Sequence, residues 1–312
     1  MKIFLKKFIA IAMLLLTLCI SIGSCKKELY DIKQKEEGYN PEQKIKKIYI
    51  SNYSGPKYLI QEWTWSEDKL MKVEYYRHYE DSISSGVYVC NTEYYTYDDD
   101  KLVKVADKNG YLQISYTNSR YGKIEYYWNE GNRFIATWDF SYKNNKVSKI
   151  TLTLDYSDIW SEKVAQGGLF SSLIPKKFIS GIMSSAKSST EDTFPMTMIV
   201  TYKYNGDNVK EQKFTAPGTN DCLTYTYGAY DKMQNPFYKY VGLMNPPPYM
   251  VHTIDMVTSK SNPLKMIVFY PVPWYNSVAE YSYIYKDGFP IEVKVVTVGS
   301  FPNQYKLYYE YE

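Results

Sequence analysis

The stretch Tyr95-Thr-Tyr97-Asp-Asp-Asp-Lys-Leu102-Val-Lys-Val105 contains the pattern that decides the fold of this chain. Two aromatic residues at alternate positions end one extended segment. A polar tetrapeptide follows, and a hydrophobic-x-Lys-hydrophobic segment begins. Alternation with a period of two is typical of a strand with one buried face, and Asp-rich tetrapeptides favour tight turns. The stretch therefore predicts a β-hairpin.

The same unit recurs at uneven intervals, and in all but one looser copy the offset from the second aromatic residue to the hydrophobic one is the same. The copies are Trp63-Thr-Trp65 with Leu70, Phe140-Ser-Tyr142 with Val147, Tyr202-Lys-Tyr204 with Val209, and the looser Tyr283-Ile-Tyr285-Lys-Asp287-Gly288. Hairpins that follow one another without helical crossovers require an antiparallel sheet, and uneven spacing favours a meander. We predict an all-β fold, an antiparallel hairpin meander that is strongly curved or closed into a barrel-like sheet.

One segment breaks this pattern. Residues 158–187 lack alternation and carry apolar residues at spacings of three and four, such as Phe170, Leu173 and Ile174. This spacing indicates one or two amphipathic helices, and such helices are marginal in water unless their apolar faces are buried. We therefore predict a helical insertion that packs on the sheet as a structural plug, with a functional lid as the alternative.

The N-terminal residues resemble a secretory signal. Lys2, Lys6 and Lys7 precede an apolar run too short to span a bilayer well, and Ile22-Gly23-Ser24-Cys25 fits the bacterial lipobox. The pattern predicts a signal peptide over residues 1–24, lipidation of Cys25, a flexible tether over 25–44 and a single β domain over 45–312.

The charge composition excludes binding to nucleic acid through a basic surface. The chain has 37 Lys and Arg, 34 Asp and Glu, and a formal net charge of +3. The three lysines before Cys25 account for this excess, so the rest of the chain is balanced and lacks the basic surface that nucleic acid requires. Aromatic residues are abundant, with 36 Tyr, 12 Phe and 6 Trp, and they favour strands.

Catalytic and metal-binding motifs are missing from the sequence. His78 and His252 are the only histidines, and no zinc, phosphate-loop or nucleophile-elbow motif occurs. We expect no cofactor and no metal, and we interpret Asp98-Asp99-Asp100 as a turn in preference to a calcium site. The lack of these motifs favours a protein that is not an enzyme. A hydrolase with paired carboxylates stays open as the alternative, as does a disulfide between Cys90 and Cys222.

Large rings on proline-rich segments are the candidate ligand contacts. Tyr249 follows Pro246-Pro247-Pro248, and Trp274 and Tyr275 follow Pro271-Val272-Pro273. Proline directs such segments to loops or sheet edges, where rigid rings offer contact area at low entropic cost. Glycans and peptides both fit such rings, and so does simple packing of the rings against the sheet.

The lipobox, the tether and the aromatic hairpins resemble envelope lipoproteins of Bacteroidota type. Tyr230-Asp231-Lys-Met-Gln-Asn235-Pro236-Phe237, after Tyr225-Thr-Tyr227, is similar to a recurring element of one such family, which has no assigned function and is described as having a porin-like fold. The resemblance implies a curved or closed antiparallel meander and no active site. Asp81-Ser82-Ile83 is similar to the O-glycosylation sequon of these bacteria, which makes Ser82 a candidate site.

These observations together predict a lipoprotein of the outer membrane, on its periplasmic face or at the cell surface, that binds a glycan or a partner protein or has a structural role. Its membrane contact is expected through the lipid anchor. A membrane-spanning barrel is disfavoured, because Tyr281, Tyr283 and Tyr285 follow one face continuously, whereas spanning barrels confine tyrosine largely to two girdles.

Overall fold

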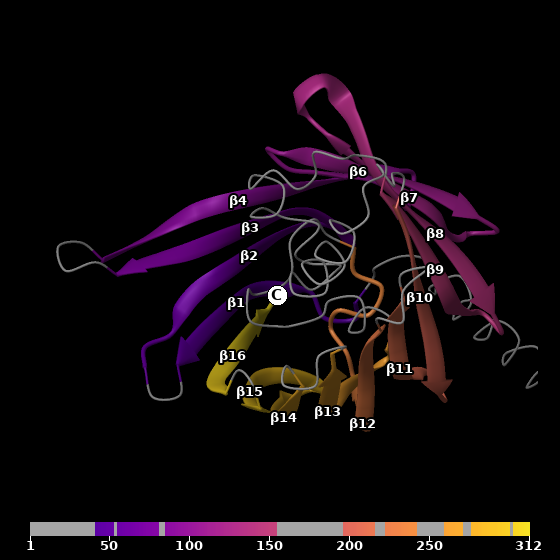
Figure 1. Cartoon of the computed structure of the whole chain (residues 1–312). Helices are drawn as coiled ribbons and strands as arrows, with labels where there is room; N and C mark the ends of the chain where they lie inside the picture. The colour runs from indigo at the N-terminus through magenta and orange to yellow at the C-terminus, as the bar shows by residue number, and fades with distance from the viewer. Residues whose placement is uncertain are drawn as a thin grey trace, which may run out of the picture.

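The computed structural model describes residues 41–52, 55–80, 85–154, 196–215, 222–241, 259–270, 276–299 and 302–312. The strands of these residues form a closed antiparallel barrel in which neighbours in sequence are neighbours in space (Figure 1). In chain order they are β1 (Ile45–Asn52), β2 (Tyr58–Ser66), β3 (Lys69–Glu80), β4 (Ser85–Asp98), β5 (Lys101–Ala106), β6 (Gly110–Thr117), β7 (Arg120–Trp128), β8 (Arg133–Lys143), β9 (Lys146–Leu154), β10 (Met196–Asn205), β11 (Asn208–Thr215), β12 (Cys222–Gln234), β13 (Ser261–Phe269), β14 (Ser277–Lys286), β15 (Phe289–Gly299) and β16 (Asn303–Tyr311). A short 3-10 helix, η1 (Glu130–Asn132), joins β7 to β8. The predicted antiparallel meander is confirmed.

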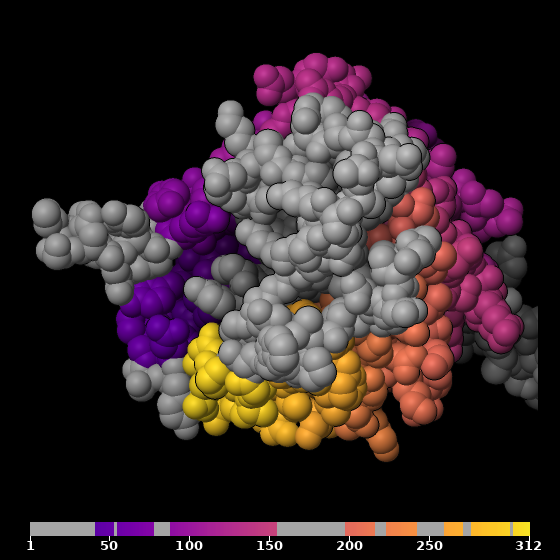
Figure 2. Space-filling view, viewed as in Figure 1, coloured from indigo at the N-terminus to yellow at the C-terminus, as the bar shows by residue number. Residues whose placement is uncertain are grey.

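The barrel closes between its first and last strands. β1 and β16 pair from Ile45 opposite Tyr311 to Asn52 opposite Tyr305. Figure 2 shows the yellow C-terminal strands against the indigo N-terminal ones. Every described strand therefore has two neighbours, and none of them presents an open edge for aggregation.

The repeated sequence unit forms the tight turns at one end of the barrel. Tyr97 pairs with Leu102 across a turn in which Asp99 has a φ of 50°. The Asp287-Gly288 turn has φ values of 51° and 83°, a conformation that favours Gly, Asn and Asp. The register shifts just before Tyr97, and it shifts at the equivalent place in the other copies. The polar tetrapeptide thus encodes both the turn and a β-bulge beside it.

Both aromatic residues of the unit face the barrel interior. The Trp63 and Trp65 rings stack at 6.3 Å, and the Tyr309 and Tyr311 rings stack at 6.5 Å. On β14 the inward Tyr281 is buried while the neighbouring Glu280 is exposed. The continuous tyrosine face predicted for this strand therefore lies inside the barrel.

A ring of eight hydrogen bonds joins successive hairpins at the tight-turn end. In each bond an aromatic side chain of an even-numbered strand donates to a backbone carbonyl of the preceding strand, at 2.7–3.1 Å. The bonds are Trp65 to Ile45, Tyr97 to Leu70, Tyr116 to Leu102, Tyr142 to Tyr121, Tyr204 to Val147, Tyr230 to Val209, Tyr283 to Pro263 and Tyr311 to Pro290. In four of the units, and in the Tyr309-Glu-Tyr311 pair, the donor is the second aromatic residue, which is a tyrosine in all but Trp65.

The eighth unit of this ring is split between the two ends of the β domain. Tyr309-Glu-Tyr311 supplies the aromatic half, and Lys44-Ile45-Lys-Lys-Ile48 supplies the hydrophobic-x-Lys-hydrophobic half. The backbone N–H of Glu312 donates to the carbonyl of Lys44 at 3.0 Å, where the other units have a turn. Closure of the barrel therefore completes a repeat.

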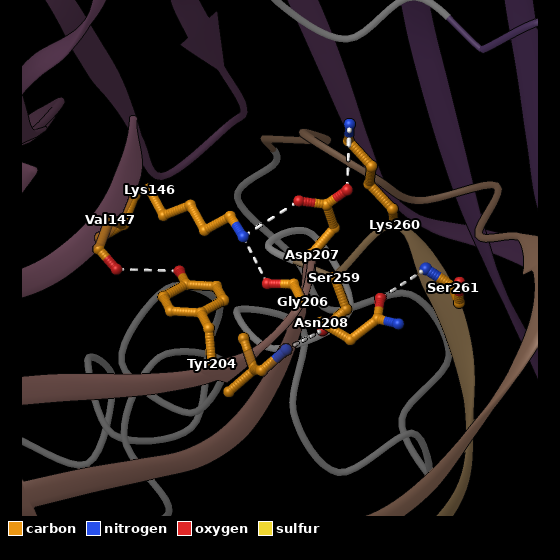
Figure 3. A network of polar contacts seen from close by, with 10 residues as sticks. Lys146, Val147, Tyr204, Gly206, Asp207, Asn208, Ser259, Lys260 and Ser261 are labelled. Atoms are coloured by element: carbon orange, nitrogen blue, oxygen red, sulfur yellow. Dashed lines mark hydrogen bonds and ion pairs between the residues drawn. The ribbon is translucent and has the colours of Figure 1, made fainter. Parts of the chain in front are cut away.

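Two lysines that follow tight turns, Lys69 and Lys146, add a second link between hairpins. Lys146 donates to the carbonyl of Gly206 and pairs with Asp207 at 3.0 Å, while Tyr204 of the same hairpin bonds Val147 (Figure 3). Lys69 makes the equivalent contacts with the turn of the next hairpin, through the Asp99 carbonyl at 2.5 Å and Asp100 at 3.0 Å. Because these ion pairs are exposed, they position the turns more than they stabilise them.

Removing one hydroxyl from the ring should have a measurable cost. Burial raises the pKa of Tyr142 to about 12, so its hydroxyl keeps its proton and donates to Tyr121. Tyr142→Phe should lower the free energy of unfolding by about 1 kcal/mol in urea titrations. Tyr94→Phe is the matched control, because this exposed tyrosine takes no part in the ring. Equal urea midpoints for the two variants would contradict a stabilising role.

The structure tests the other sequence predictions only in part. The helical insertion predicted over 158–187 lies outside the described residues. Cys90 is a free, half-buried cysteine, so the disulfide with Cys222 is absent. Among the helices of the described part, none has the length and apolar character needed to cross a membrane.

Candidate functional site

A buried carboxylate lies on the inner wall of β4. Glu93 has no exposed surface, and it is the only charged side chain among the described residues that is buried. The Tyr95 hydroxyl donates to its Oε2 atom at 2.5 Å, and the Tyr240 hydroxyl donates to the same atom at 3.3 Å. Tyr240 also lies 3.2 Å from Tyr75 and 2.7 Å from Tyr95, hydroxyl to hydroxyl. We call these four residues the Glu93 cluster.

The electrostatics of the cluster keep its phenols protonated. Burial raises the pKa of Tyr75 and of Tyr95 well above 10, and the negative charge of Glu93 raises both further. The hydroxyls therefore act as hydrogen-bond donors at neutral pH. Donation to a carboxylate offsets much of the cost of holding that charge away from water.

Two amides extend the polar character of this wall. Gln61 and Asn91 pair across the strands with Tyr75, one on each side, and both are buried. Gln61 accepts from the Trp63 indole at 2.9 Å, while its amide nitrogen has no partner among the described residues. Asn91 donates to Asp107 at 3.0 Å. The inner wall of β2 to β4 is thus a polar patch in a mainly apolar interior.

The segment that follows β12 crosses the interior to reach this patch. Phe237 and Tyr240 come from the chain just after β12, yet their rings lie 6.2 Å and 5.0 Å from the Trp63 ring on β2. The Phe237 ring also lies 5.9 Å from the Tyr309 ring on β16. Figure 1 shows β12 and β2 in different parts of the wall. We call residues 235–241 the crossing segment.

Polar contacts fix the base of the crossing segment. The Asn235 amide nitrogen donates to the Ser259 carbonyl at 2.9 Å, and its backbone N–H donates to the Lys260 carbonyl at 2.8 Å. Lys260 pairs with Asp207, and Asn208 accepts from Ser261 N–H (Figure 3). The segment therefore leaves the wall from a rigid base at the tight-turn end.

The outer wall carries charges of both signs. Ion pairs at 2.6–4.0 Å join outward-facing side chains. The two partners lie on neighbouring strands or two residues apart on one strand. The pairs are Lys47–Glu62, Lys72–Glu74, Lys123–Glu125, Lys203–Glu211, Lys265–Glu280 and Lys306–Glu292. Apolar residues such as Val73, Ile124 and Val293 occupy the inward positions between them. The barrel is therefore charged outside and mainly apolar inside.

Most candidate residues from the sequence fall outside the described part. Cys25, Ser82, Tyr249, Trp274 and Tyr275 all do, so their roles stay predictions. The predicted turn at Asp98-Asp99-Asp100 is confirmed, since residues 99 and 100 form the tip of the β4–β5 hairpin. The described residues contain no cluster of His, Cys, Asp and Glu suited to a metal ion.

The Glu93 cluster itself was not predicted. Alternation offered a signal, because Glu93 shares its face with Tyr95 and Tyr97, which the hairpin unit places inside. The contribution of Tyr240 had no such signal, because it comes from a contact across the barrel between distant parts of the chain.

Comparisons with known proteins concern the fold alone. No family model matches the chain, and no curated protein matches its sequence. The chain is similar in structure to a porin-like protein from Bacteroides uniformis ATCC 8492, with a TM-score of 0.53 and 10% identity over 88% of this chain and 100% of that one. A porin-like protein from Bacteroides vulgatus ATCC 8482 matches 87% of this chain and 99% of its own length at 10% identity, with a TM-score of 0.45. The first match supports the porin-like fold that the family resemblance implied.

Proposed function

We propose that this chain is a lipid-anchored barrel of the bacterial cell envelope that stands beside the bilayer and acts as a binding module, without conducting solutes. The observation that carries the proposal is the radial distribution of charge. Spanning barrels have an apolar outer band and a polar interior, and this barrel has the reverse arrangement.

Charged side chains on the outer wall would be costly in a bilayer. A lysine on the lipid face of a spanning barrel costs about 2–4 kcal/mol near the bilayer midplane. Six ion pairs encircle this barrel, on strands from β1 to β16. These charges lie on strands all around the barrel toward its tight-turn end, so water is the medium that suits this part of the wall.

The interior supports the same conclusion. The crossing segment places Phe237 and Tyr240 between opposite parts of the wall, and the rings around them are buried. A water-filled path needs polar side chains and open space along the axis. The described interior is mainly apolar at this level and is crossed by chain.

The start of the β domain is compatible with the proposed anchor at Cys25. Lys44 lies at the tight-turn end, where it bonds the Glu67 carbonyl at 2.5 Å and pairs with Asp68. A tether from Cys25 would hold this end toward the membrane. The opposite end would then face away, free to meet a glycan or a partner protein.

The carboxylate hydrolase finds no support among the described residues. Glu93 is the only buried acid there, and phenol hydroxyls surround it. A glycosidase of that kind needs a second carboxylate facing the same cleft.

Planar bilayer recording tests the proposal. The purified lipidated protein, added to both chambers at concentrations at which a general porin inserts readily, should produce no conductance steps. Reproducible steps that vanish when the protein is heat-denatured would refute the non-conducting role.

A further inference from the structure

Four aromatic side chains follow one another across the outer face of β4 to β8. Tyr94 pairs with Ala106, Ala106 with Tyr111, Tyr111 with Tyr127, and Tyr127 with Phe134. These positions face outward, because the residues beside them, such as Tyr95 and Tyr126, are buried inside. We call Tyr94, Tyr111, Tyr127 and Phe134 the aromatic row.

The rings of the row are ordered and accessible. Tyr111 and Tyr127 stack at 5.1 Å with 14° between their planes, and Phe134 meets Tyr127 edge-on at 5.6 Å. The Tyr111 hydroxyl donates to Asn132 at 2.7 Å, which fixes this ring. Tyr94 is 57% exposed, and the other three are partly exposed. Rings fixed in this way offer contact area at little entropic cost.

A polar row runs parallel to the aromatic one. Lys104, Gln113, Glu125 and Thr137 occupy successive paired positions on β5 to β8. The Lys104 ammonium lies 4.1 Å from the centre of the Tyr111 ring, so the two rows are in contact. Donors and acceptors therefore lie along one side of the rings.

We propose that this face binds a linear, neutral polysaccharide. Sugar rings present apolar C–H faces that pack on aromatic rings and hydroxyl groups at their edges that bond polar side chains, so a row of each kind suits this ligand. The aromatic row crosses five strands, β4 to β8, and at about 4.8 Å per strand it is roughly 19 Å long. That length accommodates several sugar units.

The charge of the face selects a neutral polymer. Lys104 and Lys123 are balanced by Glu125 and Asp139, and Lys123 pairs with Glu125 at 4.0 Å. A face with no excess of either sign gives no electrostatic advantage to an acidic polysaccharide. Beyond β8 the outward polar positions continue with Thr153 on β9, which pairs with Thr137, and Thr197 on β10, which pairs with Thr153.

This proposal rests on the binding role proposed above and supplies its ligand class. Affinity electrophoresis of the full-length Cys25→Ser protein tests it, in gels cast with hydroxyethyl cellulose, mixed-linkage β-glucan, galactomannan, arabinoxylan or soluble starch. At least one neutral polymer should retard the protein, and polygalacturonate should not. The double variant Tyr111→Ala, Tyr127→Ala should bind the retarding polymer at least tenfold more weakly.

Two further variants keep the test specific. Tyr127→Phe keeps the ring and should bind within threefold of the parent. Phe269→Ala removes an exposed ring on β13, outside the row, and should also leave binding unchanged. Circular dichroism checks that each variant is folded.

Several results would overturn the glycan site. They are the absence of retardation by every neutral polymer, retardation by polygalacturonate alone, full binding by the double alanine variant, or equal loss in Phe269→Ala. Sedimentation of the Cys25→Ser protein with phosphatidylcholine vesicles, abolished in the double alanine variant, would instead make the row a membrane contact. Conductance in the bilayer experiment would refute the non-conducting role separately.

Discussion

Phe237→Ala should lower the free energy of unfolding by about 3–5 kcal/mol, the usual cost of emptying a buried phenylalanine site. Phe237 is 2% exposed, and its ring packs against Trp63, Tyr240 and Tyr309. Its removal would leave a cavity between opposite parts of the wall. Chemical denaturation of the purified protein measures the loss.

Phe269→Ala is the matched control for this prediction. The Phe269 side chain is 45% exposed on the outer face of β13, so its loss should change stability by no more than about 0.5 kcal/mol. A small effect at both positions would mean that the crossing segment rests in the interior without holding its walls together.

The second large effect is expected at Glu93. Glu93→Ala deprives the hydroxyls of Tyr95 and Tyr240 of their carboxylate acceptor in a buried site, and it should cost about 3 kcal/mol. Glu93→Gln keeps an acceptor oxygen and nearly the same shape, so it should cost roughly half as much. Thermal and urea unfolding at pH 7 measure both.

Glu280→Ala controls for the loss of a carboxylate as such. Glu280 pairs with Lys265 at 3.1 Å on the outer wall, where 60% of its side chain is exposed, so its removal should cost less than about 1 kcal/mol. If Glu93→Ala were instead as stable as the parent, the carboxylate would be retained at a cost, and a role other than stability would have to explain it.

The hairpins were predictable from the sequence because their determinants are local. The aromatic pair, the polar tetrapeptide and the hydrophobic-x-Lys-hydrophobic segment lie within about a dozen residues, and the turn and register follow from them. Closure was left open, because it depends on pairing between β1 and β16 at opposite ends of the domain. The split unit at Lys44-Ile45 and Tyr311 shows where a signal for closure existed.

The direction in which the aromatic face points was harder to predict. Alternation gives two faces but does not say which one is inside, and an aromatic face suits either lipid or a packed interior. The charged residues of the opposite face show that it is the outer one, since residues such as Lys203 and Glu211 pair across strands there. The aromatic row has its own sequence signal, because Tyr94-Tyr95 and Tyr126-Tyr127 break the alternation and place one ring on each face.

The contacts across the barrel had no local signal. Tyr240 reaches Glu93 from 147 residues away in sequence. Short patterns describe a strand and its neighbours, whereas such a contact depends on the path of a connection through the interior.

The central claim is that the outer wall of this barrel faces water and that Cys25 alone holds the protein at the membrane. The most direct test is fractionation of cells that export the Cys25→Ser protein behind a cleavable signal peptide. The account predicts that the variant is recovered in the soluble fraction without detergent, while the parent stays with the membranes. Recovery of the exported variant only after detergent extraction of the membranes would contradict the claim.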